Sequence, residues 1–197
     1  MNITIVFPTQ SEAQYFTRED VNVTFCGVGL ISSTYNTYKI IQETRPDFIV
    51  MVGIAGVYPG VDIAVGETVI VTREYQADLG LFSKKGFKHL GDGDCEMGYK
   101  PIISIDCPYA EEQTLFPKAV SNSMNCGLAP FVKTEGVDIE NMEGAGFFYV
   151  AKELDVPFCE LRTISNVVDV NDDEWDYETS ITLLTAALNK LIDSLQA

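Results

Sequence analysis

The segment from Phe48 to Val52 constrains the fold most, because it is apolar at every position and is followed directly by Gly53. A strand with one wet face alternates apolar and polar residues, whereas a strand that is apolar on both faces must be covered on both sides. Segments 2–7 and 158–164 also fit buried strands. The chain is therefore predicted to build around a buried sheet.

Segments with helical spacing lie between the predicted strands. Helices are predicted over 30–43, over 143–154, and over 176–195, where apolar residues fall on one face. Further strands are predicted at 21–25, 67–72 (continuing towards Tyr75), 119–125 and 137–139, and a glycine-rich loop at 83–100. Strands that alternate with helices indicate a layered α/β domain with a central, mostly parallel mixed sheet flanked by helices. No repeat or linker divides residues 1–197, so a single domain is expected.

The charge of the chain excludes several classes of partner. Lys and Arg number 13 against 29 Asp and Glu, which gives a formal net charge of −16. Phosphate backbones and anionic membrane surfaces would repel such a chain, so neither nucleic acid nor a membrane is an expected partner. The longest apolar run, 48–58, is too short to span a bilayer, and residues 1–7 lack the features of a signal peptide.

The cysteines and the single histidine limit the possible chemistry. Five cysteines without CxxC spacing favour neither a disulfide framework nor a zinc site, so a cytoplasmic location is expected. His89 lies in a polar stretch and is predicted to be a solvated loop residue. Asp92, Asp94 and Glu96 alternate like the start of a calcium loop, but the later ligands are absent, so no metal is expected. Acid–base chemistry must then rest on carboxylates, amides or bound water.

Polar residues follow several predicted strands at the edge where α/β sheets bind ligands. Glu12 follows the first strand, Gly53–Gly56 a central one and Ser165–Asn166 the last, while 141–143 begins a helix. Each also has an ordinary structural interpretation. Glu12 and Glu143 are both compatible with carboxylates at helix starts, and Asn166 with a turn cap. The glycines alone do not distinguish a tight turn from a close approach of a ligand.

The combination of these motifs resembles the nucleoside phosphorylase/nucleosidase superfamily. Residues 140–146 (Glu-Asn-Met-Glu-Gly-Ala-Gly), 156–158 (Val-Pro-Phe) and 161–166 (Leu-Arg-Thr-Ile-Ser-Asn) resemble consecutive motifs of its methylthioadenosine nucleosidases. Upstream, 26–29 (Cys-Gly-Val-Gly) and 52–56 (Val-Gly-Ile-Ala-Gly) resemble its glycine-rich segments.

Within the superfamily the chain is most similar to the futalosine hydrolases. The likeness rests on Ile54 in place of a serine, on 78–80 followed by Gly86-Phe87, and on Asn166 in place of an aspartate. An asparagine amide offers both a donor and an acceptor, which suits a 6-oxopurine such as hypoxanthine better than adenine. The resemblance therefore implies hydrolysis of the N-glycosidic bond of a purine nucleoside, futalosine, to hypoxanthine and dehypoxanthine futalosine.

The resemblance also implies roles for individual residues. Glu12 corresponds to the glutamate that activates the attacking water, and Glu143 to the carboxylate that binds the ribose hydroxyls. Met142 would pack on the ribose, and Asn166 would contact the base. Arg162 corresponds to an arginine near the catalytic water, although a role as the buried partner of Glu143 or Glu12 is equally open. The remaining substrate-binding residues implied are Gly53, Ile54, Ala55 and Gly56.

Water is expected to be the nucleophile. Phosphorylases of this superfamily present basic residues to phosphate, whereas 27–30 (Gly-Val-Gly-Leu) carries no Lys or Arg. The resemblance implies no cofactor and at least a homodimer. Two alternatives stay open, namely a nucleosidase acting on methylthioadenosine, S-adenosylhomocysteine or inosine, and a nucleoside-binding protein without turnover. The residues that bind the 5′ substituent, and whether 84–100 forms a lid, are not predicted.

Overall fold

The computed structural model describes residues 1–92, 101–127, 129–169 and 174–197. The strands and helices of this part of the chain are, in order, β1 (Ile3–Phe7), β2 (Asn22–Phe25), α1 (Leu30–Thr44), β3 (Phe48–Val57), β4 (Thr68–Gln76), β5 (Gly80–Ser83), β6 (Gly86–His89), a 3₁₀ turn (Leu90–Asp92), β7 (Ser104–Asp106), α2 (Pro108–Glu112), β8 (Lys118–Ser123), β9 (Ile139–Asn141), α3 (Gly144–Glu153), β10 (Phe158–Val167) and α4 (Tyr177–Gln196).

One mixed sheet organises the molecule, as the sequence predicts. β3 lies at its centre and pairs in parallel with β1 and β10 and antiparallel with β9. Because β10 also pairs with β4, β4 with β8, and β8 with β9, five strands form a closed circuit. This closure explains the apolar sequence of β3, in which nine of the ten residues are buried.

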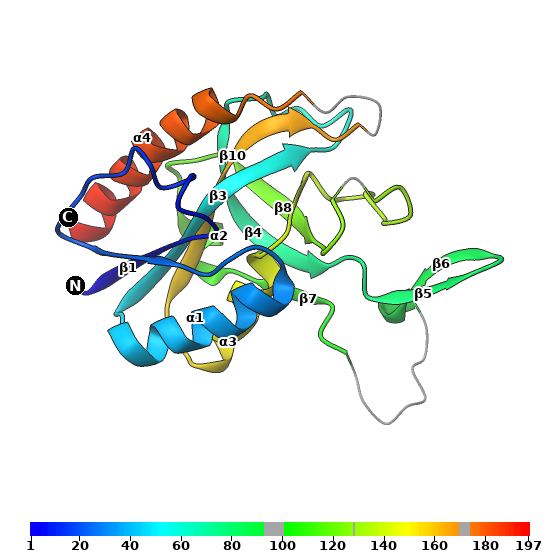
Figure 1. The fold of residues 1–197 in the computed structure, drawn as a ribbon, viewed down its shortest axis with the longest axis horizontal. Helices are drawn as coiled ribbons and strands as arrows, with labels where there is room; N and C mark the ends of the chain where they lie inside the picture. Colours follow the sequence, from blue (N-terminus) through cyan, green and yellow to red (C-terminus); the bar gives the residue numbers. More distant parts are fainter. Residues whose placement is uncertain (93–100, 128, 170–173) are drawn as a thin grey trace.

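Helices cover the sheet on opposite sides (Figure 1). α1 and α3 pack together on one side, while α4 packs on β10 and β3. α4 buries Ile181, Leu184, Leu188, Leu191 and Ile192, as its helical spacing predicts. In the described part of the chain, no helix combines the length and apolar character needed to cross a bilayer.

Two glycine-containing segments differ from their prediction. Gly53–Gly56 was expected to follow its strand, but β3 continues through these residues to Val57. β10 pairs with the whole of this stretch, and β9 pairs with Gly56 and Val57. Similarly, Ser165–Asn166 was expected to follow its strand, yet β10 continues to Val167 with a register shift between Ile164 and Asn166.

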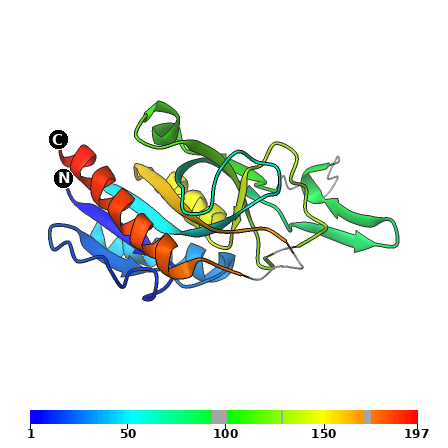
Figure 2. The ribbon, with the colours of Figure 1, turned by 90° about the horizontal axis from the view of Figure 1, so that it is seen from above.

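The predicted loop over 83–100 is partly wrong. β5 and β6 form an antiparallel hairpin that projects from the end of the molecule opposite the two termini (Figures 1 and 2). His89 belongs to β6 rather than to a solvated loop. It is half-buried, its Nε2 donates to the Gln76 carbonyl at 2.7 Å, and its Nδ1 accepts from Gly91 N–H. Residues 93–100, which include Asp94, Glu96 and the second part of the segment 84–100, lie outside the described residues.

Candidate active site

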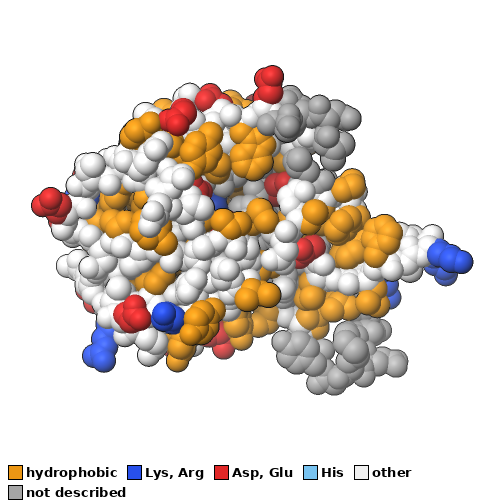
Figure 3. Space-filling view, viewed as in Figure 1, with side chains coloured by type: hydrophobic (Ala, Val, Ile, Leu, Met, Phe, Trp, Pro, Cys, Tyr) orange, Lys and Arg blue, Asp and Glu red, His pale blue; other side chains and the backbone are white. Residues whose placement is uncertain are grey.

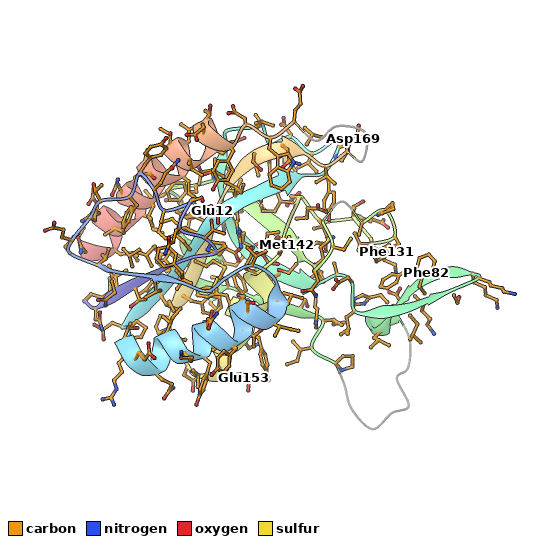
Figure 4. All side chains as sticks on the ribbon, viewed as in Figure 1. Glu12, Phe82, Phe131, Met142, Glu153 and Asp169 are labelled. Carbon is orange, nitrogen blue, oxygen red and sulfur yellow. The ribbon has the colours of Figure 1, made fainter. Side chains whose placement is uncertain are left out.

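A cavity of about 390 Å³ opens where β1, β3 and β10 reach their carboxyl ends. Its volume is typical of small-ligand sites. Figure 4 shows Glu12 and Met142, which both line it, in the middle of the molecule. A larger cavity of about 500 Å³, between α1, α3 and the segment around β7, has mostly apolar walls. The predicted site residues Glu12, Met142, Glu143, Arg162, Asn166, Ile54, Ala55 and Gly56 all line the first cavity.

Glu12 lies in the turn after β1 and is only 5% exposed. Thr9 Oγ1 donates to its Oε2 at 2.6 Å, and the N–H of Ile54 donates to its Oε1 at 3.2 Å. Burial raises the pKa of Glu12 above its ordinary value, although the Thr9 hydrogen bond and the Arg162 charge oppose the shift. A carboxylate with a raised pKa is a better proton acceptor, which suits Glu12 to activate water.

Glu143 stands immediately before α3, and its carboxylate is held from two sides. Arg162 Nη2 donates to its Oε2 at 3.2 Å, and the N–H of Gly29 donates to its Oε1 at 3.3 Å. Ser33 Oγ donates to the Glu143 carbonyl at 2.9 Å, which ties the start of α3 to α1. The carboxylate is therefore fixed in the cavity wall before any ligand binds.

Asn141 supports Glu143 in a way that the sequence did not reveal. Its Oδ1 accepts from the N–H groups of Glu143 and Gly144, both at 2.8 Å, and thereby caps α3. The same oxygen accepts from Arg162 Nη2 at 3.2 Å. Because Asn141 is buried, this contact links the helix start directly to the arginine.

Arg162 is 1% exposed and forms part of the cavity wall. Its Nε donates to Glu160 Oε1 at 2.6 Å, and its Nη1 donates to the Ile54 carbonyl at 3.1 Å. The 3.2 Å ion pair with Glu143 is the buried partnership that the sequence left open. A position of Arg162 near the catalytic water stays a prediction. Its hydrogen bonds hold the guanidinium between β3 and β10.

Asn166 presents its amide to the same cavity from the end of β10. Ser165 Oγ donates to its Oδ1 at 2.8 Å, and its Nδ2 donates to the Val167 carbonyl at 3.2 Å. Gly56 leaves the room that this amide needs. A Cβ at Gly56 would lie 3.3 Å from Asn166 Nδ2 and 2.8 Å from a methyl group of Val168.

Sequence reasoning missed several residues of the cavity wall. Thr9, Val28, Trp175 and Tyr177 also line it. Thr9 stands three residues before Glu12, a spacing typical of a hydroxyl that bonds a nearby backbone N–H, and its Oγ1 does accept from Glu12 N–H at 3.2 Å. Trp175 is the single tryptophan of the chain, which could have marked it as a ligand contact. It is 54% exposed in the structure.

The charges around the cavity disfavour a phosphate dianion. Glu12, Glu140 and Glu143 line it, and Arg162 is the one cation that does so among the described residues. Because Arg162 is already paired with Glu143 and Glu160, it offers little positive charge to an anion. Neutral ligands fit this wall better than phosphate does.

Gly53 does not line the cavity, but it provides room for the groups that do. A Cβ at Gly53 would lie 2.5 Å from Arg162 Nη1 and 2.9 Å from Glu12 Oε1. Gly53→Ala is therefore expected to displace both side chains and to lower kcat by about 10²-fold. Steady-state kinetics would test this expectation, with melting temperature as the check on folding.

Gly127→Ala is the matched control for that substitution. It adds the same methyl elsewhere in the cavity wall, where the closest contact is Glu140 Oε1 at 3.8 Å. It is expected to cost less than about threefold in kcat, because this is an ordinary van der Waals distance. Equal losses in the two variants would contradict the role assigned to Gly53.

The raised pKa of Glu12 predicts the acid side of the pH profile. Because only the ionised carboxylate accepts a proton, kcat/KM is expected to rise with pH through a pKa above the ordinary range of glutamate. Thr9→Val removes the 2.6 Å hydrogen bond that stabilises the charged form, so the acid side of the profile should move to higher pH. If the acid side of the profile lay at the ordinary glutamate pKa and did not move in Thr9→Val, Glu12 would not be the group that titrates.

Comparison with known proteins agrees with this architecture. A futalosine hydrolase from Thermus thermophilus is 28% identical over 180 residues, which cover 84% of this chain and 78% of that protein. A 5′-methylthioadenosine/S-adenosylhomocysteine nucleosidase from Maridesulfovibrio salexigens is 24% identical over 200 residues, covering 89% and 80%. The solved structure of futalosine hydrolase from Helicobacter pylori shares the fold, with a TM-score of 0.78, 18% identity and 98% of both chains covered. A model of the phosphorylase superfamily matches residues 87–197, more than half of the sequence. The chain therefore belongs to the phosphorylase superfamily.

Proposed function

We propose that the protein is an N-glycosyl hydrolase that cleaves futalosine into hypoxanthine and dehypoxanthine futalosine. The observation that carries the proposal is the pair of buried carboxylates, Glu12 and Glu143, set in the wall of one cavity. The similarity to futalosine hydrolases in sequence and in fold supports the same reaction. No metal or organic cofactor is invoked in this mechanism.

Glu12 acts as the general base in this proposal. It accepts a proton from a water molecule as that water attacks the anomeric carbon of the ribose. The bond to the purine breaks as the sugar gains oxocarbenium character, so a carboxylate near the sugar is most useful in the transition state. Glu143 binds the 2′- and 3′-hydroxyls through its two oxygens, and Met142 packs on the ribose.

Asn166 recognises the leaving base. Hypoxanthine presents a keto oxygen and N7 along one edge, and an amide can donate to this edge as well as accept from it. Ser165 Oγ donates to the amide oxygen, and one N–H of Nδ2 donates to the Val167 carbonyl. The second N–H of Nδ2 is therefore the donor directed to the base. Ile54 and Gly56, from the end of β3, complete the wall beside it.

The first experiment is a phosphate-free incubation of the purified protein with futalosine, inosine and methylthioadenosine. Chromatography of the free bases identifies both the substrate and the reaction. Hypoxanthine from futalosine in the absence of phosphate is the expected result. No free base from any of the three would overturn the proposal in favour of a binding protein without turnover.

Adenine nucleosides are the second candidate substrates, because the curated relatives include 5′-methylthioadenosine/S-adenosylhomocysteine nucleosidases. Release of adenine from methylthioadenosine, with futalosine left intact, would favour that candidate. Hypoxanthine from inosine at a rate equal to that from futalosine would indicate a nucleosidase indifferent to the 5′ substituent. The amide of Asn166 favours a 6-oxopurine such as hypoxanthine over adenine.

We also propose that the protein works in the cytoplasm as a homo-oligomer, a dimer or larger. The cysteine pattern of the sequence supports the cytoplasmic location.

Exposed apolar side chains support the proposed homo-oligomer. Ile31, Tyr35 and Tyr38 on α1 are 84%, 64% and 49% exposed, and Tyr149 on α3 lies near them. Figure 3 shows hydrophobic side chains along the α1 side of the molecule. A patch of this kind is typical of a protein interface.

Light scattering on the wild-type protein and on Ile31→Glu tests the proposed assembly. The wild type is expected to have at least twice the mass of one chain. Ile31→Glu should release monomers, because it places a charge in the apolar patch. A monomeric wild type would contradict the proposal.

A further inference from the structure

Two fully buried carboxyl groups lie behind the catalytic cavity and have no part in the mechanism above. Glu74 belongs to β4 and Glu160 to β10, and both are 0% exposed. Both lie against Gly144, the first residue of α3. A Cβ at Gly144 would collide with Glu74 Oε1 and lie 2.7 Å from Glu160 Oε2. The two carboxyl groups therefore face each other across the space that glycine leaves open.

Glu74 supports the groups that begin α3. It accepts from Asn141 Nδ2 at 2.6 Å and from Ser123 Oγ at 2.7 Å. Asn141 caps the helix, as described above, and Ser123 Oγ accepts from the N–H of Ala145 at 2.8 Å. Glu74 therefore orients both side chains that bind the free N–H groups at the start of α3.

Glu160 supports the arginine. Its Oε1 accepts from Arg162 Nε at 2.6 Å. No donor among the described residues reaches its Oε2, although this oxygen is buried. A buried carboxylate oxygen without a hydrogen bond is costly, so Oε2 requires a proton donor.

The excess of negative charge around the pair favours a bound proton, which would serve as that donor. Arg162 faces the carboxyl groups of Glu74, Glu160, Glu143 and Glu12. Tyr58, Cys107 and Cys159 also face the pair, and each stays neutral at pH 7 because burial raises its pKa. One guanidinium does not compensate two adjacent buried carboxylates together with two others nearby. A proton bound between the two oxygens lowers the charge and satisfies Glu160 Oε2.

We propose that Glu74 and Glu160 share one proton, carried on Glu74 Oε1 and donated to Glu160 Oε2, and that the pair positions Arg162 and the start of α3 for ribose binding by Glu143. The two groups then hold a single negative charge, which neutralises Arg162. Burial and the charge of Glu160 hold the pKa of Glu74 well above its usual range, which favours its protonated form. The Arg162 Nε contact at 2.6 Å favours the charged form of Glu160, so the proton belongs on Glu74. Both are positioning residues, because neither lines the catalytic cavity.

Infrared spectroscopy tests the shared proton directly. The difference spectrum of wild type minus Glu74→Gln at pH 7 is expected to contain the C=O stretch of a protonated carboxylic acid. A merely structural pair of ionised carboxylates would give no such band, and its absence would overturn the proposal. This measurement needs no turnover, so it stays valid even if the proposed substrate is wrong.

Kinetics tests the positioning role, which rests on the proposed function. Glu160→Gln removes the charge that holds Arg162 and is expected to lower kcat/KM by about 10²-fold. Glu74→Gln keeps an N–H donor to Glu160 but loses the acceptor for Asn141 Nδ2. Its kcat/KM should therefore fall by about fivefold to tenfold. Glu112→Gln, an exposed glutamate on α2, is the control and should match the wild type.

Equal losses in Glu74→Gln and Glu160→Gln would overturn the assignment of the proton to Glu74. Melting temperatures report whether each variant folds. If Glu160→Gln does not fold, the infrared band decides the shared proton, and the kcat/KM of Glu74→Gln decides the positioning role. Failure of the wild type to hydrolyse any nucleoside, with the band present, would contradict the proposed function alone.

Discussion

Glu12→Gln is expected to lower kcat by about 10²- to 10⁴-fold and to leave substrate binding nearly intact. The substitution removes the proton acceptor but keeps the shape of the side chain. Its amide oxygen can still accept from the N–H of Ile54, while its NH₂ group can donate to Thr9 Oγ1, which is free to rotate. The fold should tolerate the change, because a buried negative charge is removed rather than added.

Single-turnover kinetics and calorimetric binding of futalosine would measure the two effects separately. Weak turnover with unchanged affinity would assign Glu12 to the chemical step. A variant that matched the wild type in both turnover and affinity would show that Glu12 is not the base. Loss of affinity without a change in kcat would place Glu12 in binding only.

Glu143→Gln is expected to lower kcat/KM by about 10²- to 10⁴-fold. Two hydrogen bonds from sugar hydroxyls to a carboxylate are worth about 3–6 kcal/mol together, and these contacts strengthen as positive charge develops on the ribose. The neutral amide accepts through one oxygen only. The variant should retain its fold, because Arg162 keeps Glu160 as its charged partner.

A substrate lacking the 2′-hydroxyl provides the matched test of this assignment. If Glu143 binds that hydroxyl, Glu143→Gln should cost less with the 2′-deoxy nucleoside than with the ribonucleoside, since the contact is already absent. An identical penalty with both substrates would show that Glu143 acts elsewhere. The comparison separates a ribose contact from a general disturbance of α3.

Elements with strong local patterns could be predicted from the sequence. The apolar face of α4 and the buried strands β1 and β3 lie where periodicity places them. The helix α1 also forms where it is predicted, but its apolar residues Ile31, Tyr35 and Tyr38 are exposed. The end of β3 could not be predicted, because its glycines are compatible with either a turn or a strand. The strand continues because β10 and β9 pair with it. Pairing with strands distant in sequence cannot be predicted from local propensity.

Some residues of the candidate site could be predicted from the sequence, and others could not. Glu12, Glu143 and Asn166 could be singled out because each follows a predicted strand or begins a helix and also belongs to a family motif. The roles of Asn141, Glu74 and Glu160 could not be predicted, because they depend on contacts between strands far apart in the chain. Gly144 gives a weak signal in the sequence, and only the carboxyl groups against it explain why a side chain would not fit.

The central place of β10 has a consequence for how the nascent chain matures. β3 and β4 leave the ribosome about a hundred residues before β10, which then inserts between them and pairs with both. Such non-local pairing gives the protein a high contact order and slows its folding. Because β10 carries Arg162 and Asn166, hydrolytic competence would be among the last properties that the growing polypeptide acquires.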